Sequence, residues 1–112
     1  MKEKKFIFDE ENCPVTAAMK VIGGKWKPIL INAVYQTSPA RFGELKRSVT
    51  GITQSMLTAQ LRELEEDGII NRKVYAEVPP KVEYTITEFG MTLQPVLQSL
   101  GNWGQTYMLQ KK

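Results

Sequence analysis

A cluster of small polar side chains at helical spacing is the part of this sequence best suited to chemistry. Gln54, Ser55 and Thr58 carry amide or hydroxyl groups, and Ala59 beside them leaves room for a close approach. Gln can form two hydrogen bonds with adenine, and Ser or Thr can bond to any base edge. Arg62, one turn further along, is better suited to a phosphate. The cluster therefore favours contact with a DNA groove, and a solvated helix face is the alternative.

The residues that flank this cluster predict the helix that must carry it. Thr53 is a natural N-cap, and Gly68 is placed to end the helix. The apolar stripe of this segment consists of Leu57, Leu61 and Leu64. At roughly 100° per residue, most of the polar cluster lies opposite these leucines. We therefore expect the leucines to hold the helix on a core while the polar cluster faces outward.

A shorter helix and a turn precede the polar helix. The apolar edge of the segment ARFGELKRSV consists of Phe42, Leu45 and Val49. Thr50-Gly51 then supply the turn, so that the two helices form a helix-turn-helix. Arg41, at the start of the shorter helix, and Lys25, further upstream, are candidate phosphate contacts. Neither is specific by itself, because exposed basic side chains are usually only solvated.

Two strands after the polar helix predict a hairpin with a basic tip. The segments 70–75 and 81–86 are rich in strand-forming residues, and the second alternates clearly between apolar and polar. Pro79-Pro80 stiffen the connection AEVPP, and Arg72, Lys73 and Lys81 flank it. A rigid basic loop suits the DNA backbone or minor groove, whereas a sheet edge protected by Lys and Pro is the alternative. The order of these elements is typical of a winged helix-turn-helix.

Further helices are predicted on both sides of this unit. Pro14 opens a helix that ends at Gly23-Gly24. In KWKPILINAVY, with Pro28 in the first turn, the expected apolar face is Trp26, Ile29, Leu30, Ala33 and Val34. Thr87 can cap a last helix to about residue 110, which Pro95 should kink or divide. The expected apolar face of that last helix is Leu93, Val96, Leu97, Leu100, Trp103 and Tyr107. The predicted fold is mainly α with a small β-hairpin.

The composition excludes several classes of protein. The 112 residues contain one Cys and no His, which removes the usual general base and the commonest metal ligand. No glycine-rich phosphate loop is present, so we expect no enzyme, no metal site and no cofactor. The hydrophobic fraction of 42% and net charge of +3 are those of a single basic globular domain. No apolar run is long enough to cross a membrane, and a cytoplasmic location is expected.

Cys13 is the only thiol, and it precedes Pro14 at the start of a predicted helix. The helix dipole at this end favours the thiolate, which makes Cys13 a candidate for oxidant sensing. The alternative is a small buried apolar residue without reactivity. Because the chain has no second Cys, any disulfide must join two subunits or a small thiol.

Several sequence blocks together resemble a known family. CPVTAAMKVIGGKWKPILI, RFGELKR, GITQSMLTAQLRELEEDGII, VYAEVPPKVEYTITEFG and LQPVLQSLGNWG are similar to the HxlR-type winged helix-turn-helix transcriptional regulators of bacteria and archaea. The resemblance covers Cys13 to about Trp103. It leaves an N-terminal arm, residues 1–12, outside a domain at 13–112. It implies that Thr53 to Arg62 lie on the recognition helix and Glu77 to Lys81 at the wing tip. Several members of the family sense oxidants or electrophiles through a cysteine at the position of Cys13.

The same resemblance implies a homodimer that reads a pseudo-palindromic operator on double-stranded DNA. The N-terminal and C-terminal helices would form the interface. The interface candidates are Val15, Leu97, Leu100, Trp103 and Tyr107. So many large apolar residues are more than a small core can bury, which favours burial between two subunits. The alternative is that they simply cover the core of their own chain. A winged-helix module that binds only proteins is the alternative function. The spacing of residues predicts no ligand pocket. It does not identify the operator or the effector, or whether the protein represses or activates transcription.

Overall fold

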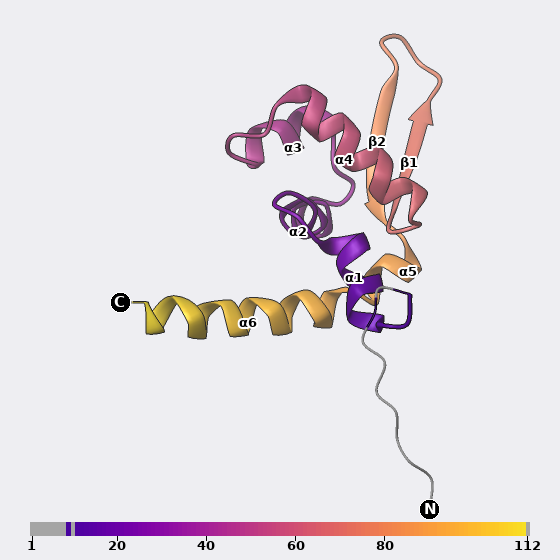
Figure 1. The fold of residues 1–112 in the computed structure, drawn as a ribbon. Coiled ribbons are helices and arrows are strands. Elements are labelled where there is room, and N and C mark those ends of the chain that lie inside the picture. Colours follow the sequence, from indigo (N-terminus) through magenta and orange to yellow (C-terminus); the bar gives the residue numbers. More distant parts are fainter. Residues whose placement is uncertain (1–8, 10, 112) are drawn as a thin grey trace, which may run out of the picture.

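The computed structural model describes residue 9 and residues 11–111 (Figure 1). Most of the expected N-terminal arm, residues 1–8 and 10, lies outside the described part. The described residues form, in order, α1 (Pro14–Ile22), α2 (Lys27–Thr37), α3 (Phe42–Ser48), α4 (Gln54–Glu66), β1 (Ile70–Tyr75), β2 (Lys81–Ile86), α5 (Glu88–Met91) and α6 (Gln94–Gln110). The expectation of a mainly helical fold with one hairpin is confirmed.

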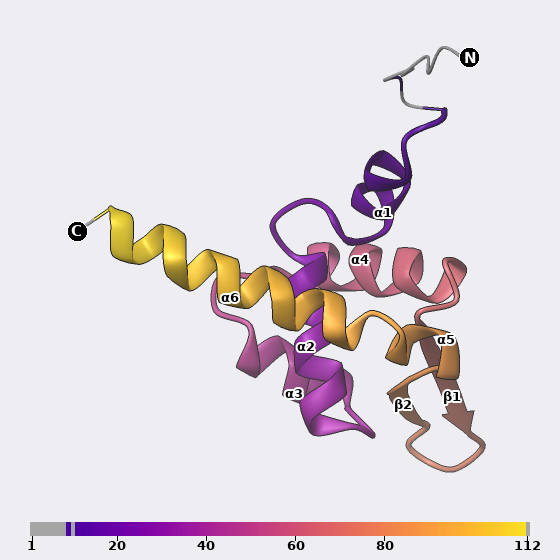
Figure 2. The same cartoon turned by 90° about the horizontal axis from the view of Figure 1, so that it is seen from below.

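Helix α2 lies at the centre of the fold, with α3, α4, α6 and the hairpin arranged around it (Figures 1 and 2). The core residues are Ile22, Leu30, Ile31, Val34, Ala40, Leu45, Val49, Ile52, Leu57, Leu61, Leu64, Ile69, Ile70 and Tyr84. The face expected for α2 was partly wrong, because Ile29 is 46% exposed while Ile31 is buried. A helix with neighbours on several sides is buried on more than one stripe, so a single amphipathic face does not describe it.

The helix-turn-helix forms as its local signals predict. Thr53 caps α4, and its Oγ1 accepts a hydrogen bond of 3.1 Å from the Met56 backbone N–H. Gly51 in the turn has φ 87°, and Gly68 after α4 has φ 77°, in the left-handed region that glycine adopts most easily. The three leucines of α4 are buried against the core. The polar side of α4 is therefore turned outward, as expected.

The hairpin is antiparallel, and its register pairs Ile70 with Ile86 and Tyr75 with Lys81. Both strands have the predicted bounds. Ala40 forms an additional bridge to Tyr84, with reciprocal backbone hydrogen bonds of 2.8 Å. This bridge ties the segment before α3 to β2. The base of the hairpin is thereby fixed beside the helix-turn-helix, while its tip projects beyond it (Figure 1).

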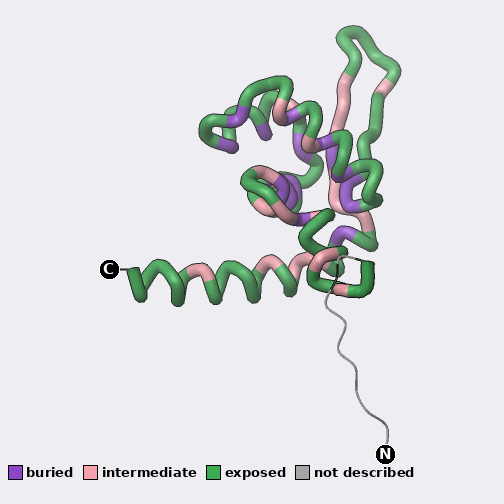
Figure 3. The backbone as a smooth tube through the Cα atoms, viewed as in Figure 1, coloured by how far each residue is buried: buried purple, intermediate pink, exposed green. Residues whose placement is uncertain are grey.

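The C-terminal helix is divided as Pro95 predicts. α5 ends at Met91, and α6 begins at Gln94 with Pro95 in its first turn. Helix α6 extends away from the rest of the fold and is exposed along most of its length (Figure 3). Leu93 and Leu97 pack against the core, but Val96, Leu100, Trp103 and Tyr107 do not. The single apolar face expected for this helix is therefore split. No helix among the described residues is long and apolar enough to span a membrane.

Candidate nucleic-acid interface

Six of the predicted contact residues lie together on the outer side of α4. The capping residue and the five outward side chains line one shallow depression of about 620 Å³: Thr53, Gln54, Ser55, Thr58, Ala59 and Arg62. All six are exposed. The buried leucines fix the rotation of α4 about its axis, so this side cannot turn inward without opening the core.

Hydrogen bonds within α4 decide what each polar side chain can offer. The Thr58 hydroxyl donates to the Gln54 carbonyl oxygen at 2.9 Å. Its proton is thus engaged, and Thr58 presents an acceptor oxygen and a methyl group. Ser55 Oγ lies 3.3 Å from Thr53 Oγ1. The side-chain amide of Gln54 makes no hydrogen bond within the described residues, so it can both donate and accept, which suits an adenine edge.

A second depression of about 480 Å³ lies between α4 and the hairpin. It brings Arg72 of β1 beside Gln54, Thr58 and Arg62 of α4. Two arginines from different elements therefore face one groove, where they can bind phosphate or a base edge. Glu65 also lines this groove, at its end toward the C-terminus of α4. The negative charge of Glu65 limits how far a DNA backbone can follow the helix.

The outer face of the hairpin carries a different set of charges. Because side chains alternate along a strand, the pairs Lys73–Glu83 and Tyr75–Lys81 share one face, and Arg72 lies on the other. Lys73 Nζ and Lys81 Nζ lie 4.8 and 5.0 Å from the centre of the Tyr75 ring. From the sequence, Arg72, Lys73 and Lys81 were expected to flank the tip of the hairpin. The structure brings Lys73 and Lys81 together and separates them from Arg72.

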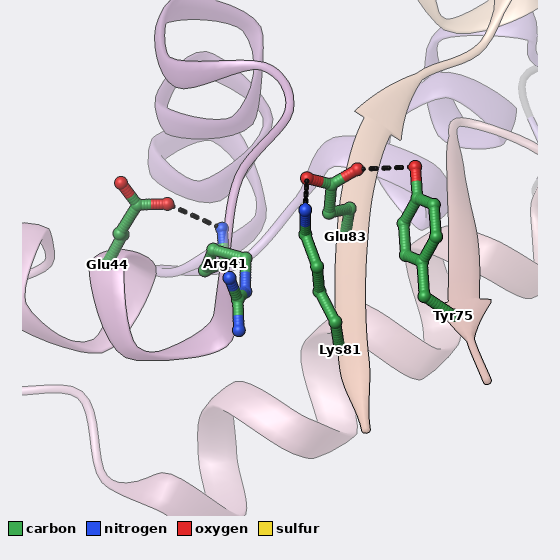
Figure 4. Close-up of polar contacts among 5 residues, drawn as sticks. All are labelled: Arg41, Glu44, Tyr75, Lys81 and Glu83. Atoms are coloured by element: carbon green, nitrogen blue, oxygen red, sulfur yellow. Dashed lines mark hydrogen bonds and ion pairs between the residues drawn. The ribbon is translucent and has the colours of Figure 1, made fainter. Parts of the chain in front are cut away.

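Glu83 reduces the positive charge of this face (Figure 4). The Tyr75 hydroxyl donates to Glu83 Oε1 at 2.8 Å, and Lys81 Nζ lies 3.4 Å from Glu83 Oε2. The Tyr75 hydrogen bond, followed by the charges of Lys81 and Arg41, lowers the pKa of Glu83 despite an opposing effect of burial. Sequence reasoning missed Tyr75 and Glu83. Their cross-strand positions in the predicted hairpin were the available signal.

The two upstream candidates are exposed and occupy different settings. The backbone N–H of Arg41 donates to Glu44 Oε1 at 2.8 Å (Figure 4). The Arg41 guanidinium forms no ion pair with another described residue. Lys25 lies in the turn before α2, with Nζ 4.6 Å from the centre of the Trp26 ring. Neither lines the two depressions at α4.

Lys27 is a basic residue that sequence reasoning did not single out. It is only 8% exposed, and its Nζ lies 2.7 Å from Glu63 Oε1. This ion pair links the first turn of α2 to α4. Glu63 therefore helps to hold α4 on the core through its contact with α2. No local pattern indicates this pairing, because 36 residues separate the two side chains.

Cys13 occupies the N-cap position of α1 and is partly buried. The backbone carbonyl of Cys13 accepts from the Ala17 N–H at 3.1 Å, but no backbone N–H of the described residues donates a capping hydrogen bond of normal geometry to its side chain. The nearby Thr16 backbone N–H, the Thr16 hydroxyl and the Val15 backbone N–H nevertheless lower the pKa of the thiol, and burial opposes them weakly. The thiolate is thus favoured relative to an ordinary cysteine. Among the described residues, no group of three or more Cys, Asp or Glu is placed to hold a metal ion.

Four of the five predicted interface residues are exposed apolar side chains. Val15 on α1 is 68% exposed, and Trp103 on α6 is 66% exposed. The rings of Trp103 and Tyr107 stack with their centres 5.7 Å apart. Leu100 lies on the same side of α6, one turn earlier. Leu97 differs from the other candidates, because it packs partly against the core of its own chain. The alternative, that these residues simply cover the core of their own chain, applies only to Leu97.

Comparison with known proteins supplies an independent view of this architecture. Residues 21–112 match the family model described as HxlR-like helix-turn-helix. The HTH-type transcriptional regulator YybR of Bacillus subtilis (strain 168) is 52% identical over 107 residues, which cover 95% of this chain and 85% of YybR. The redox regulator HypR is similar in its reduced form (TM-score 0.82, 49% identity, 89% of this chain and 100% of HypR). Its oxidized form gives a TM-score of 0.77 and 53% identity over 84% of this chain and 96% of HypR.

Proposed function

Because the chain belongs to the HxlR-like helix-turn-helix family, we propose that it is a transcriptional regulator that binds DNA as a homodimer. Each copy of α4 enters a major groove, so that the dimer reads a pseudo-palindromic operator in the cytoplasm. The proposed DNA-binding unit starts at Cys13, since α1 packs on α2. Its mechanism is occupancy of DNA, without a catalytic step or a cofactor.

One observation carries the proposal most directly. The residues Thr53, Gln54, Ser55, Thr58, Ala59 and Arg62 share one exposed depression, while the opposite side of α4 is locked into the core. A reading helix needs this division, because base contacts require an outward polar face whose position does not vary. In the proposal Gln54, Ser55 and Thr58 contact bases, whereas Arg62 and Arg72 bind phosphates.

The remaining basic residues have a supporting role in this proposal. Lys73 and Lys81, on the outer face of the hairpin, attract the DNA backbone, as do Arg41 and Lys25 near the starts of α3 and α2. Such contacts add affinity without reading sequence. The dimer is supported by the large apolar side chains that α6 and α1 leave exposed within the described chain. A two-fold axis would bury this surface and double the number of DNA contacts.

Binding to DNA from the protein's own promoter region tests the proposal. We expect tight binding that falls steeply as salt rises, because phosphate contacts release counterions. Fluorescence anisotropy with labelled duplexes, at several salt concentrations and against a scrambled duplex of equal length, measures this. Equal affinity for both duplexes, or an affinity independent of salt, would contradict the proposal.

A redox response through Cys13 is a second part of the proposal. The lowered pKa of its thiol and the similarity of the chain to the redox regulator HypR support this assignment. Two Cys13 thiolates from different subunits would form one S–S bond by passing two electrons to an oxidant such as diamide, which takes up two protons from water as it is reduced. A Cys13 thiolate and a small thiol would react in the same way, with the thiol proton supplying one of these two. Diamide should change DNA affinity in the wild type and not in Cys13→Ser. An identical response of both proteins would exclude Cys13 as the sensor.

A further inference from the structure

A cavity of about 590 Å³ lies between α2 and the segment formed by α5 and the first turns of α6. It shares no lining residue with the two depressions at α4. Its apolar part includes Ile29, Ile86, Met91 and Leu97. Its polar part consists of Asn32, Tyr35, Gln36, Gln94 and Gln98. A cavity of this size, with apolar walls and a few hydrogen-bonding groups, suits a small organic molecule.

The lining carries no charged side chain, although 24% of the whole chain is charged. A charged ligand would lose part of its hydration here without gaining a partner ion, which disfavours it relative to a neutral one. The amides of Asn32, Gln36, Gln94 and Gln98 can each donate and accept hydrogen bonds. The cavity therefore favours a neutral ligand that has its own hydrogen-bonding groups.

Two of the remaining lining residues favour an aromatic ring. Tyr35 from α2 and Met91 from α5 both reach the surface of the cavity. A tyrosine ring stacks on flat aromatic ligands, and a methionine sulfur makes favourable contacts with their edges. The Gln94 side-chain amide donates to the Tyr35 hydroxyl, which joins α2 to α6 across the cavity.

The exposed apolar surface of α6 does not compete for this space. At roughly 100° per residue, Gln94 and Gln98 lie on the side of α6 opposite Trp103 and Tyr107. A second copy that covers the stacked aromatic rings therefore leaves the cavity side of the helix open.

We propose that this cavity binds a neutral, planar aromatic compound of the phenol or aryl-amide class, and that the ligand alters DNA binding. The second part rests on the proposed function. The ligand would contact α2, which the Lys27–Glu63 ion pair ties to α4, and α6, which carries the apolar surface. A change in the angle between α2 and α6 would move the two reading helices of a dimer relative to each other.

The test uses 4-hydroxybenzamide as the probe and 4-hydroxybenzoate as its charged match. Titration of the ¹⁵N-labelled full chain, without DNA, should shift the amide signals of residues 29–36 and 91–98. We expect a dissociation constant on the order of 1 mM, and roughly tenfold weaker binding of the charged match. Asn32→Trp should fill the cavity and abolish the shifts, whereas Lys46→Trp, which adds the same ring to exposed α3, should not. Both substituted positions are exposed, so both variants should fold.

Three results would overturn the site: no shifts in these segments, equal binding of the benzoate, or unchanged binding to Asn32→Trp. The effect on function is measured separately, by DNA affinity with and without saturating probe. We expect a change of at least about fivefold, which Asn32→Trp removes. An unchanged affinity with the probe bound would overturn the coupling. Failure of the free protein to bind DNA would instead refute the proposed function and leave the ligand titration standing.

Discussion

Helices α4 and α6 both leave one side uncovered, but the uncovered sides differ in chemistry. On α4 the three leucines are buried, and the exposed side carries hydroxyls, an amide and Arg62. On α6 no residue is fully buried, and the exposed side carries Trp103 and Tyr107. An exposed polar side tolerates water and can exchange it for a DNA groove. An exposed aromatic side is unfavourable in water and favours a second protein surface.

This difference assigns two separate roles within one small chain. The polar side of α4 would determine which DNA sequence is bound, and the apolar side of α6 would determine how many copies bind together. Substitutions on the two helices should therefore have different signatures. Changes on α6 should alter assembly first and DNA binding as a consequence, while changes on α4 should alter DNA binding in an intact dimer.

The largest effect is expected for Trp103→Glu. A charge in the middle of the apolar surface should weaken the dimer by about 2–4 kcal/mol, which is roughly 30- to 1,000-fold, and DNA binding should fall with it. The monomer should remain folded, since Trp103 lies outside the core. Sedimentation velocity measures the assembly. Gln105→Glu adds the same charge on the opposite side of α6 and should leave the dimer intact; a similar loss in both variants would contradict the assignment.

A smaller effect is expected for Arg62→Ala. Loss of one phosphate contact should weaken binding to all sequences by about tenfold and reduce the slope of log affinity against log salt by about 1. The dimer should be unaffected. Lys20→Ala, which removes a positive charge from α1, is the control. If Arg62→Ala weakened only the operator and spared unrelated duplexes, Arg62 would be a base-reading residue instead.

Gln54→Ala should reduce discrimination more than affinity. Loss of one base contact should make binding roughly fivefold less selective at a single base pair of the operator, with little change in the salt slope. Thr58→Val keeps the shape and methyl group of Thr58 but removes the oxygen that accepts hydrogen bonds, and it should relax a neighbouring position. Competition among duplexes with single substitutions measures both. Uniform weakening across all duplexes would argue against base contacts at these residues.

The smallest effect is expected for Tyr75→Phe on the outer face of the hairpin. Loss of the tyrosine hydroxyl should raise the pKa of Glu83 toward its ordinary value, because that hydrogen bond is the main cause of the lowering. Because its pKa is lowered in the folded state, the Glu83 carboxylate stabilises the fold at pH values above its ordinary pKa. This contribution is lost as the pH falls through the pKa of Glu83 in the folded state. Stability should therefore depend less on acid pH in the variant. A carboxyl NMR titration measures the pKa, and Tyr107→Phe should leave it unchanged.

Much of the fold follows from short-range signals. The strand bounds, the Thr53 cap, the position of Pro28 and the division near Pro95 were all predicted, and all are confirmed. Each depends on residues within a few positions, where backbone geometry and capping are decided. The six residues on the outer side of α4 were found for the same reason. Their placement needs only the helical period and the leucine stripe.

The sequence by itself therefore determined the elements, their order and the polar side of α4. Only the tertiary structure decided how residues from distant segments meet. It buried Lys27 against Glu63, placed Arg72 and Lys73 on opposite faces of the hairpin, and separated Leu97 from Trp103 on α6. It also formed the cavity between α2 and α6. The physical reason is that the helical or strand period predicts which residues share one side of an element. Burial depends instead on which other element packs against that side.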